Sequence, residues 1–408
     1  MKKLIAIAVV FALVAVGAFA EANIGGGVGF GALLLAGDNS EKGDDDPAVF
    51  TNLNAHWTSV TFTWQSDDNV SGGKIKMNGT MNKKGGDGDP PGKLGGEIWW
   101  KPLDALKIGF INIEDEGKFG RGNAIDWGYQ SNSAAGNATT FWGGGWNSFS
   151  NARVRSGVGF FGGAGGGGDA ATSSLLYLSL TPVEGLAINL GWTSWGDTKE
   201  LFKRTTAQLT YDISGIGNLA VSFKGKEGYA TAGYRSAETV AFDFSLSALE
   251  GMNIEIGAKI PIMGKDWDGE KDLSFPMEIG LGFAMNQWSG DPLKLFSRVG
   301  VLLPSEDFGD ITAIGFDINP SYDVGIGRIY VDVGIALAMQ KDNDYSDFFW
   351  HLSPYLRKGI GVGDLYIGLS IWNGYPQDGY EGLWAIQKGD GYKELINFAV
   401  PLHFEISF

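Results

Sequence analysis

The last thirteen residues of the chain alternate strictly between apolar side chains and small or polar ones. The apolar positions are Ile396, Phe398, Val400, Leu402, Phe404, Ile406 and Phe408. This period of two indicates an extended strand with one apolar and one wetted face, because successive side chains of a strand point to opposite sides. A soluble β-sandwich can end in such a strand, but a transmembrane β-barrel needs the pattern in every strand.

The same alternation recurs along most of the chain. It is clearest in residues 186–192, 240–246, 252–260, 275–285 and 329–339. The positions between the apolar residues repeatedly carry full charges, which the dry core of a sandwich would not accept without partners. The pattern therefore favours a barrel with hydrocarbon on one side of its wall and water on the other.

Two kinds of connection separate these segments. The short connections, which predict tight hairpin turns, are 102–106, 182–186, 216–219, 248–252, 326–329 and 362–365. The longer connections, which are acidic, are 37–47, 263–272, 341–347 and 375–392. Short turns on one rim and long loops on the other are the layout of an outer-membrane barrel.

Strand assignment on this basis predicts an all-β protein, a single antiparallel transmembrane β-barrel of about 18 strands with both termini on the short-turn rim. The even count requires that 48–67 be one strand with a β-bulge near Trp57–Ser59. A barrel of about 16 strands is an alternative, as is one of about 20 if part of 149–161 joins the wall. The connection 114–170, which follows the fifth predicted strand, is far longer than any other.

Residues 1–20 are predicted to be a secretory signal peptide. Lys2 and Lys3 precede an apolar stretch from Leu4 to Val16, and Ala18-Phe19-Ala20 is a small-x-small cleavage site. The expected organisation is therefore a signal peptide, 1–20, followed by a β-barrel, 21–408. The chain contains no cysteine, which excludes disulfides and thiolate metal ligands.

The net charge of the chain is −16, from 31 basic and 47 acidic residues. Cleavage after Ala20 removes two lysines and leaves 29 basic residues, for a net charge of −18. This balance disfavours nucleic-acid binding. Because the acidic residues gather in the long connections, we expect a mouth of negative potential that enriches cations.

The signal peptide, the terminal aromatic strand, the two kinds of connection and the long segment after the fifth strand together resemble the bacterial outer-membrane porins. The resemblance covers the whole mature chain and matches no particular porin. It implies a channel for passive diffusion of ions and small hydrophilic solutes in the bacterial outer membrane, with both termini periplasmic. It also implies outer-membrane lipid and the barrel-assembly machinery as partners, allows a homotrimer, and makes Phe404, Ile406 and Phe408 the C-terminal assembly signal.

Charged residues of both signs are expected on the wetted face, where a pore lining biases which ions enter. The basic candidates are Lys74, Lys76, Lys107, Arg204, Lys224, Lys259, Lys294, Arg298, Arg328 and Arg357. The acidic candidates are Glu97, Asp243, Glu255, Glu278, Asp317, Asp332 and Glu405. The alternative is a solvated wall whose charges pair across neighbouring strands.

In the porins, the long loop after the fifth strand folds into the lumen and narrows it. The resemblance therefore gives this chain a set of constriction-loop candidates, which are Glu114, Asp115, Glu116, Arg121, Arg153 and Arg155. The alternative is a disordered, Gly-rich surface loop.

Little in the sequence indicates an enzyme. Three histidines, His56, His351 and His403, are present, and no pattern places a serine against them, so no catalytic site is expected. Residues 342–347 begin like a calcium loop but lack Gly at the sixth and Glu at the twelfth position, and we expect neither a metal site nor a cofactor. The alternative functions are a surface adhesin or ligand-binding protein with the barrel as anchor, and a soluble secreted β-protein.

Aromatic residues near the ends of the expected strands predict girdles at the two lipid–water interfaces, in preference to platforms for sugar stacking. These residues are Trp99, Trp100, Trp192, Trp195, Trp350, Tyr355 and Trp372.

Overall fold

A computed structural model of the chain describes most of the wall of the barrel. The described residues are 21–38, 49–79, 93–112, 175–193, 205–224, 236–265, 272–273, 277–286, 290–304, 311–340, 346–373 and 396–408. The predicted signal peptide, 1–20, lies outside them, as do the long connections.

Twenty strands and no helix make up the regular structure of the described residues. The strands are β1 (Glu21–Asp38), β2 (Val49–Gln65), β3 (Ser71–Gly79), β4 (Lys93–Leu103), β5 (Leu106–Asn112), β6 (Leu175–Val183), β7 (Leu186–Thr193), β8 (Thr205–Ile213), β9 (Gly217–Lys224), β10 (Ser236–Leu246), β11 (Met252–Lys265), β12 (Asp272–Leu273), β13 (Glu278–Met285), β14 (Leu293–Leu302), β15 (Ile311–Asp323), β16 (Arg328–Gln340), β17 (Ser346–Gly359), β18 (Gly363–Gly368), β19 (Ser370–Asn373) and β20 (Ile396–Ser407). Within these residues no helix is long and apolar enough to cross a membrane.

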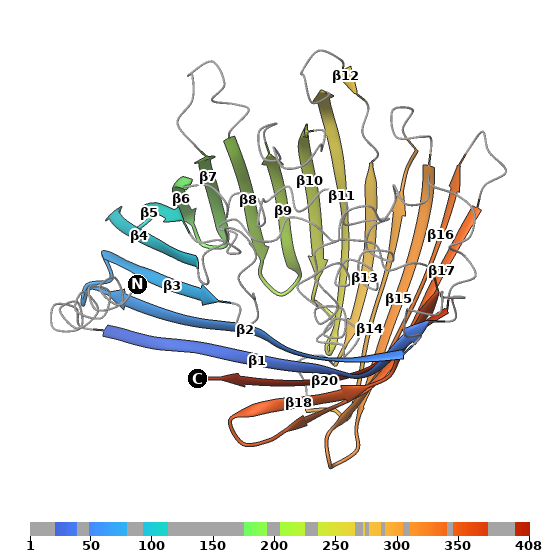
Figure 1. Cartoon of the computed structure of the whole chain (residues 1–408). Coiled ribbons are helices and arrows are strands. Elements are labelled where there is room, and N and C mark those ends of the chain that lie inside the picture. The colour runs from blue at the N-terminus through green and yellow to red at the C-terminus, as the bar shows by residue number, and fades with distance from the viewer. Residues whose placement is uncertain are drawn as a thin grey trace.

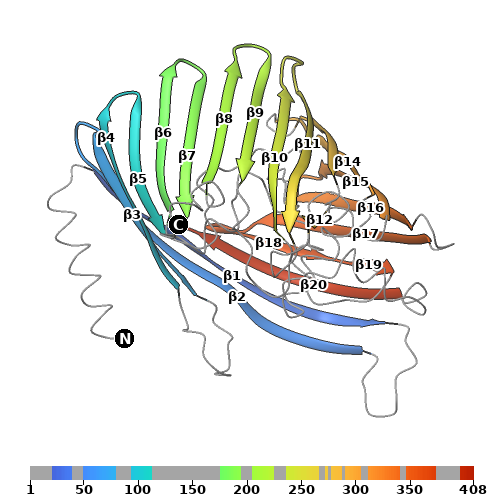
Figure 2. The same ribbon diagram turned by 90° about the horizontal axis from the view of Figure 1, so that it is seen from above.

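These strands form one closed antiparallel barrel (Figures 1 and 2). Both β12 and β13 pair with β11, and both β18 and β19 pair with β17 and β20, so each of these two pairs builds a single strand of the wall. The described wall therefore has 18 strands, and the pairing of β1 with β20 closes it. The all-β barrel of about 18 strands predicted from the alternation is confirmed.

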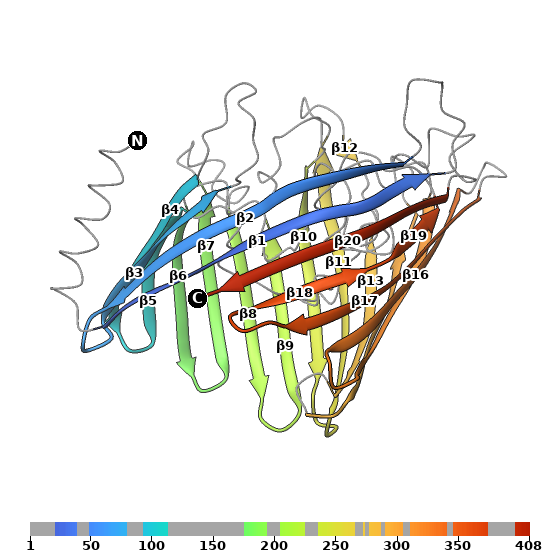
Figure 3. The same ribbon diagram turned by 60° about the horizontal axis from the view of Figure 1, so that its bottom comes forward.

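The two rims of the barrel differ as the sequence predicts. Short connections join β2–β3, β4–β5, β6–β7, β8–β9, β10–β11, β13–β14, β15–β16 and β17–β18 at one rim, which is the lower rim in Figure 3. The first and last strands of the wall also end there, because Gly26 and Phe408 exchange backbone hydrogen bonds of 2.8 and 3.0 Å. The connection 113–174, which follows β5, is the longest in the chain and lies outside the described residues.

The β-bulge that the strand count requires is present in β2. Gly29 pairs with Trp57, but the next residue, Phe30, pairs with Ala55, so His56 is the extra residue of the bulge. It lies one residue before the predicted segment Trp57–Ser59. A bulge shifts the side-chain alternation by one position, and β2 therefore remains one strand although its apolar pattern changes phase.

Two prolines explain why the strand between β17 and β20 is interrupted. The N–H of Leu369 donates to the carbonyl of Pro354 at 2.9 Å, but Pro354 has no N–H to return the bond. On the other side, Ile367 pairs with Leu402, and this register brings Gly368 opposite Pro401. The carbonyls of Gly368 and Leu369 each lose a ladder donor, and the strand divides there into β18 and β19.

The faces of the wall reverse the polarity of a soluble sheet. Glu97 is 8% exposed and its neighbour Ile98 is 62% exposed, and Ser353 and Leu352 repeat the contrast at 1% and 39%. Side chains converge on the inside of a closed sheet and diverge on its outside. The buried polar residues therefore face the lumen, and the exposed apolar residues face outwards.

Candidate functional site

The strand register gathers the charged residues of the wall on one face. Residues directly opposite each other in an antiparallel ladder share a face, and Lys74 pairs with Glu97 while Arg328 pairs with Arg357. All predicted pore-lining residues except Arg204, which lies outside the described residues, occupy this same inner face.

Several of these positions are paired with the opposite charge in the register. Lys259 lies opposite Glu278, and Arg298 lies opposite Asp317. These are positions in the backbone register, and opposite charges at directly opposed positions are the arrangement that favours pairing across neighbouring strands. The constriction-loop candidates Glu114, Asp115, Glu116, Arg121, Arg153 and Arg155 all lie outside the described residues.

On β3–β6, the inner face carries a lysine–glutamate–tyrosine cluster, formed by Lys74, Glu97 and Tyr177. The Tyr177 hydroxyl donates to Glu97 Oε1 at 2.6 Å, and Lys74 Nζ lies 3.8 Å from Glu97 Oε2. Tyr177 is on β6 and Glu97 is on β4, so the phenol crosses β5 to reach the carboxylate. It crosses at Gly109, its register partner, where a Cβ would lie 2.3 Å from the ring. Glycine is therefore the residue that permits the contact.

Trp99 also lies on the inner face, next to this cluster. Its ring is 4.4 Å from Lys107 Nζ and 5.4 Å from Lys101 Nζ, both distances to the ring centroid, and it covers Gly72 of β3. The prediction that Trp99 belongs to an interface girdle is wrong, because its side chain points away from the outer face. Trp100, which follows it, is 53% exposed on the outer face.

A second group of inner side chains, the tyrosine–arginine cluster, spans β16–β18. It comprises Tyr330, Tyr355, Arg357, Asp364 and Tyr366. The rings of Tyr330 and Tyr355 stack with centroids 4.6 Å apart. Arg357 donates to Asp364 at 2.7 Å and lies 5.5 Å from the centroid of Tyr366. Tyr355 and Tyr366 are buried, so the girdle predicted for Tyr355 is wrong as well.

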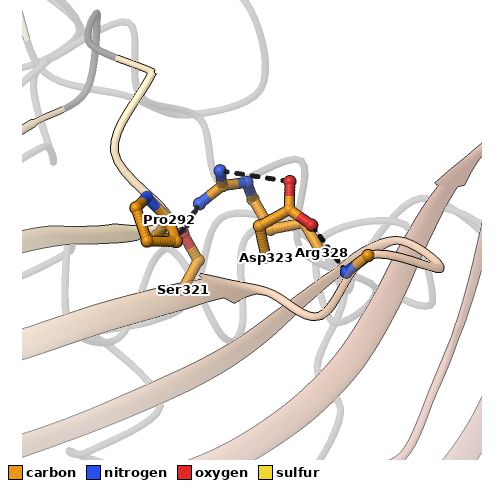
Figure 4. A network of polar contacts seen from close by, with 5 residues as sticks. Pro292, Ser321, Asp323 and Arg328 are labelled. Carbon is orange, nitrogen blue, oxygen red and sulfur yellow. Dashed lines mark hydrogen bonds and ion pairs between the residues drawn. The ribbon is translucent and has the colours of Figure 1, made fainter.

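Arg328 holds two neighbouring turns together at the short-turn rim (Figure 4). Its Nη1 donates to the Pro292 carbonyl at 3.0 Å and to Ser321 Oγ at 3.3 Å, and its Nη2 lies 3.8 Å from Asp323 Oδ2. Asp323 in turn accepts a hydrogen bond from the Gly325 N–H at 2.8 Å. The guanidinium therefore links the β13–β14 and β15–β16 hairpins.

The tyrosines of both clusters were missed as candidates, although the sequence carries a signal for them. Tyr177, Tyr330 and Tyr366 occupy the same alternate positions as the charged residues of their strands. A tyrosine on the wetted face can cover a charge and donate to it. Elsewhere in the described strands and turns, no three His, Cys, Asp or Glu side chains come together as a metal site would require.

No protein-family model and no curated protein matches the chain. Among solved structures, OccAB4 of Acinetobacter baumannii matches 96% of this chain and 98% of its own at a TM-score of 0.51 and 8% identity. The outer membrane channel DcaP of the same organism matches 96% and 98% at 0.49 and 12% identity. OmpF of Salmonella typhi, in complex with daunomycin, matches 95% and 97% at 0.48 and 7% identity.

At this level of identity the likeness concerns the fold alone. The predicted porin-like architecture is confirmed. The register and the contacts of the inner face are therefore properties of this chain.

Proposed function

We propose that the protein is an outer-membrane channel of the porin type, which lets ions and small hydrophilic solutes diffuse passively, with a weak preference for cations. The observation that carries the proposal is the reversed polarity of a closed barrel of 18 strands. Side chains cannot fill a barrel of that width, so an aqueous passage is expected along its charged inner face.

The outer face supports a location in the lipid bilayer. Ile98, Leu209, Ile256, Leu281 and Ile335 are exposed side chains of the wall on five different strands. Exposed aliphatic residues on every side are costly in water and stable in hydrocarbon. Closure satisfies the remaining requirement of the bilayer, since a closed ladder leaves no edge of unpaired backbone groups.

In this proposal the short-turn rim faces the periplasm, and outer-membrane lipid and the barrel-assembly machinery are the partners. Phe404 and Ile406 of β20, and Phe408 directly after it, occupy alternate positions on the outward side of the register, and we propose that they form the assembly signal. A homotrimer is compatible with the fold and is proposed here only as the family's usual assembly.

The cation preference rests on charge. The mature chain has a net charge of −18, obtained from 47 acidic and 29 basic residues, whereas the described inner wall carries both signs. The four long connections 37–47, 263–272, 341–347 and 375–392 hold 15 acidic and 5 basic residues, which is 10 of the 18 excess negative charges, and Asp44, Asp45 and Asp46 form the densest run. Negative potential at the mouth raises the local concentration of cations.

The test is conductance of the refolded mature chain in a planar bilayer under a salt gradient. We expect stable single-channel current steps and a reversal potential whose sign shows that potassium is more permeant than chloride. Replacing Asp44, Asp45 and Asp46 with Asn is expected to reduce that potential, most strongly at low salt. An absence of steps contradicts the channel, and a chloride preference contradicts the selectivity alone.

A further inference from the structure

Three hairpins of the short-turn rim carry the same exposed pair of residues, an aliphatic side chain followed by an acid. The pairs are Leu103-Asp104 between β4 and β5, Val183-Glu184 between β6 and β7, and Leu249-Glu250 between β10 and β11. We call these six residues the turn row. Leu103, Val183 and Leu249 are 66%, 60% and 49% exposed. The hairpin between them, β8–β9, adds the exposed Ile216.

Two aliphatic members of the turn row, Leu103 and Val183, continue the outer face of the wall. Leu103 pairs with Leu106, and Val183 pairs with Leu186. Leu106 and Leu186 share their face with the outward residues of β5 and β7, and a register shift before each pair turns Leu103 and Val183 to that side. At the β4–β5 and β6–β7 hairpins, the apolar outer face therefore extends from the wall onto the turn.

Several acids of other turns have partners within the protein. Asp68 accepts hydrogen bonds from Ser66 Oγ and from the Val70 N–H, and Asp323 and Asp364 contact Arg328 and Arg357. Within the described part of the chain, no hydrogen bond or ion pair is formed by the acids of the turn row, Asp104, Glu184 and Glu250. These three exposed carboxylates are accessible to a binding partner outside the protein.

We propose that the turn row binds the surface of the lipid leaflet, with its aliphatic side chains in the interface and its carboxylates on the primary ammonium groups of phosphoethanolamine lipids. The proposal rests on the membrane location proposed above. Two arguments favour this occupant. The row is continuous with the face that lipid covers, and carboxylates attract an ammonium headgroup and repel a purely anionic one.

The depth of the row is tested by single cysteines, because the chain has none of its own. Val183→Cys and, as control, Asp67→Cys in the β2–β3 turn are labelled with a fluorophore in vesicles that contain phosphatidylethanolamine. We expect a lipid-attached quencher to quench the label at 183 and aqueous iodide to quench the label at 67. Iodide access at 183 overturns the proposal, and so does shielding from both quenchers, which indicates a second copy or another protein on the row.

Lipid preference is tested by counting the lipids that remain around the protein in nanodiscs made from equal parts of phosphatidylethanolamine and phosphatidylglycerol. The variant is Asp104→Asn, Glu184→Gln and Glu250→Gln. The control is Asp44→Asn, Asp45→Asn and Asp46→Asn, which changes the net charge equally outside the row. Around the native protein we expect about threefold enrichment of the ethanolamine lipid over the glycerol lipid, which is the size of effect that exposed ion pairs produce. The enrichment should be lost in the variant and kept in the control.

Equal enrichment in the variant and the native chain overturns the proposal. If that variant still conducts, the channel function stands and only the lipid contact fails. A native chain that neither inserts nor conducts overturns both.

Discussion

The two inner clusters of the barrel hold their charged groups in different ways. The lysine–glutamate–tyrosine cluster lies in an unbroken ladder, and its contact between β4 and β6 depends on one glycine, Gly109. The tyrosine–arginine cluster depends on stacked rings and an ion pair, and it adjoins the interruption between β18 and β19. The first is stabilised by the regularity of the wall, and the second stabilises a place where the wall is irregular.

The largest expected effect on stability is that of a substitution at Gly109, on which only the lysine–glutamate–tyrosine cluster depends. In Gly109→Ala the new Cβ would lie 2.3 Å from the Tyr177 ring, so the phenol must leave Glu97 and the buried carboxylate loses a donor. We expect a loss on the order of 3 kcal/mol in the free energy of unfolding, measured by denaturant titration in micelles. Gly96→Ala, whose Cβ meets only an ordinary contact at 3.4 Å, is the control. Equal stability of the two variants contradicts the role of Gly109.

A smaller effect is expected where the ladder is broken. Pro354→Ala supplies an N–H for the carbonyl of Leu369 and is expected to raise the free energy of unfolding by about 1 kcal/mol. Hydrogen exchange followed by mass spectrometry should show faster exchange in 363–373 than in 93–112, and the substitution should narrow the difference. Pro182→Ala, at the end of β6, should leave both rates unchanged. Equal hydrogen-exchange rates of 363–373 and 93–112 in the native chain would contradict the proposed difference in stability between the two regions.

The ion pair of the tyrosine–arginine cluster is expected to contribute less. Arg357 and Asp364 are 37% and 31% exposed, and solvent screens a pair of this kind. A double-mutant cycle with Arg357→Ala and Asp364→Asn should give a coupling energy of about 0.5 kcal/mol in the same titration. A coupling several times larger would show that the pair, and not the ring stack, dominates this cluster.

The smallest effect concerns the turn that precedes β3. The Ser66 hydroxyl and the Val70 N–H donate to Asp68 and lower the pKa of its carboxyl below 3.8. A lowered pKa adds stability that is complete above the unfolded value and disappears as the pH falls through the folded value. Asp68→Asn should therefore lose this dependence on pH below about 4, a difference measured by acid titration of both proteins. If the stability of the variant depends on pH in the same way as that of the native protein, another titratable group causes the dependence.

Alternation made the wall predictable from the sequence. In a strand between lipid and water, apolar and polar residues must alternate. The face of the wall on which Lys74, Asp332 and Arg357 lie therefore follows from their position in this alternation. The bulge at His56 was also predictable, because only a phase change joins the two halves of β2. Trp99 and Tyr355 were wrongly assigned to the girdles, because aromatic residues near strand ends suit either face; the alternation of β4 and β17 places both on the inner face.

The contacts within the site could not be predicted in the same way. Tyr177 reaches Glu97 across an intervening strand, and nothing local in the sequence connects residues 80 positions apart. The interruption at Leu369 needs two prolines on strands that are neighbours only in the folded barrel. Arg328 was expected to line the pore, but its bonds to two turns depend on the side-by-side placement of hairpins.

The exchange of hydrogen bonds between Gly26 and Phe408 has a consequence for the order of folding. The seam of the barrel joins β1 to β20, so a chain that lacks either strand cannot close the cylinder. A nascent or truncated chain would present two open edges to hydrocarbon, where bare amides and carbonyls are not tolerated. Closure therefore requires both β1 and β20, and a stable barrel cannot form before the last strand is present.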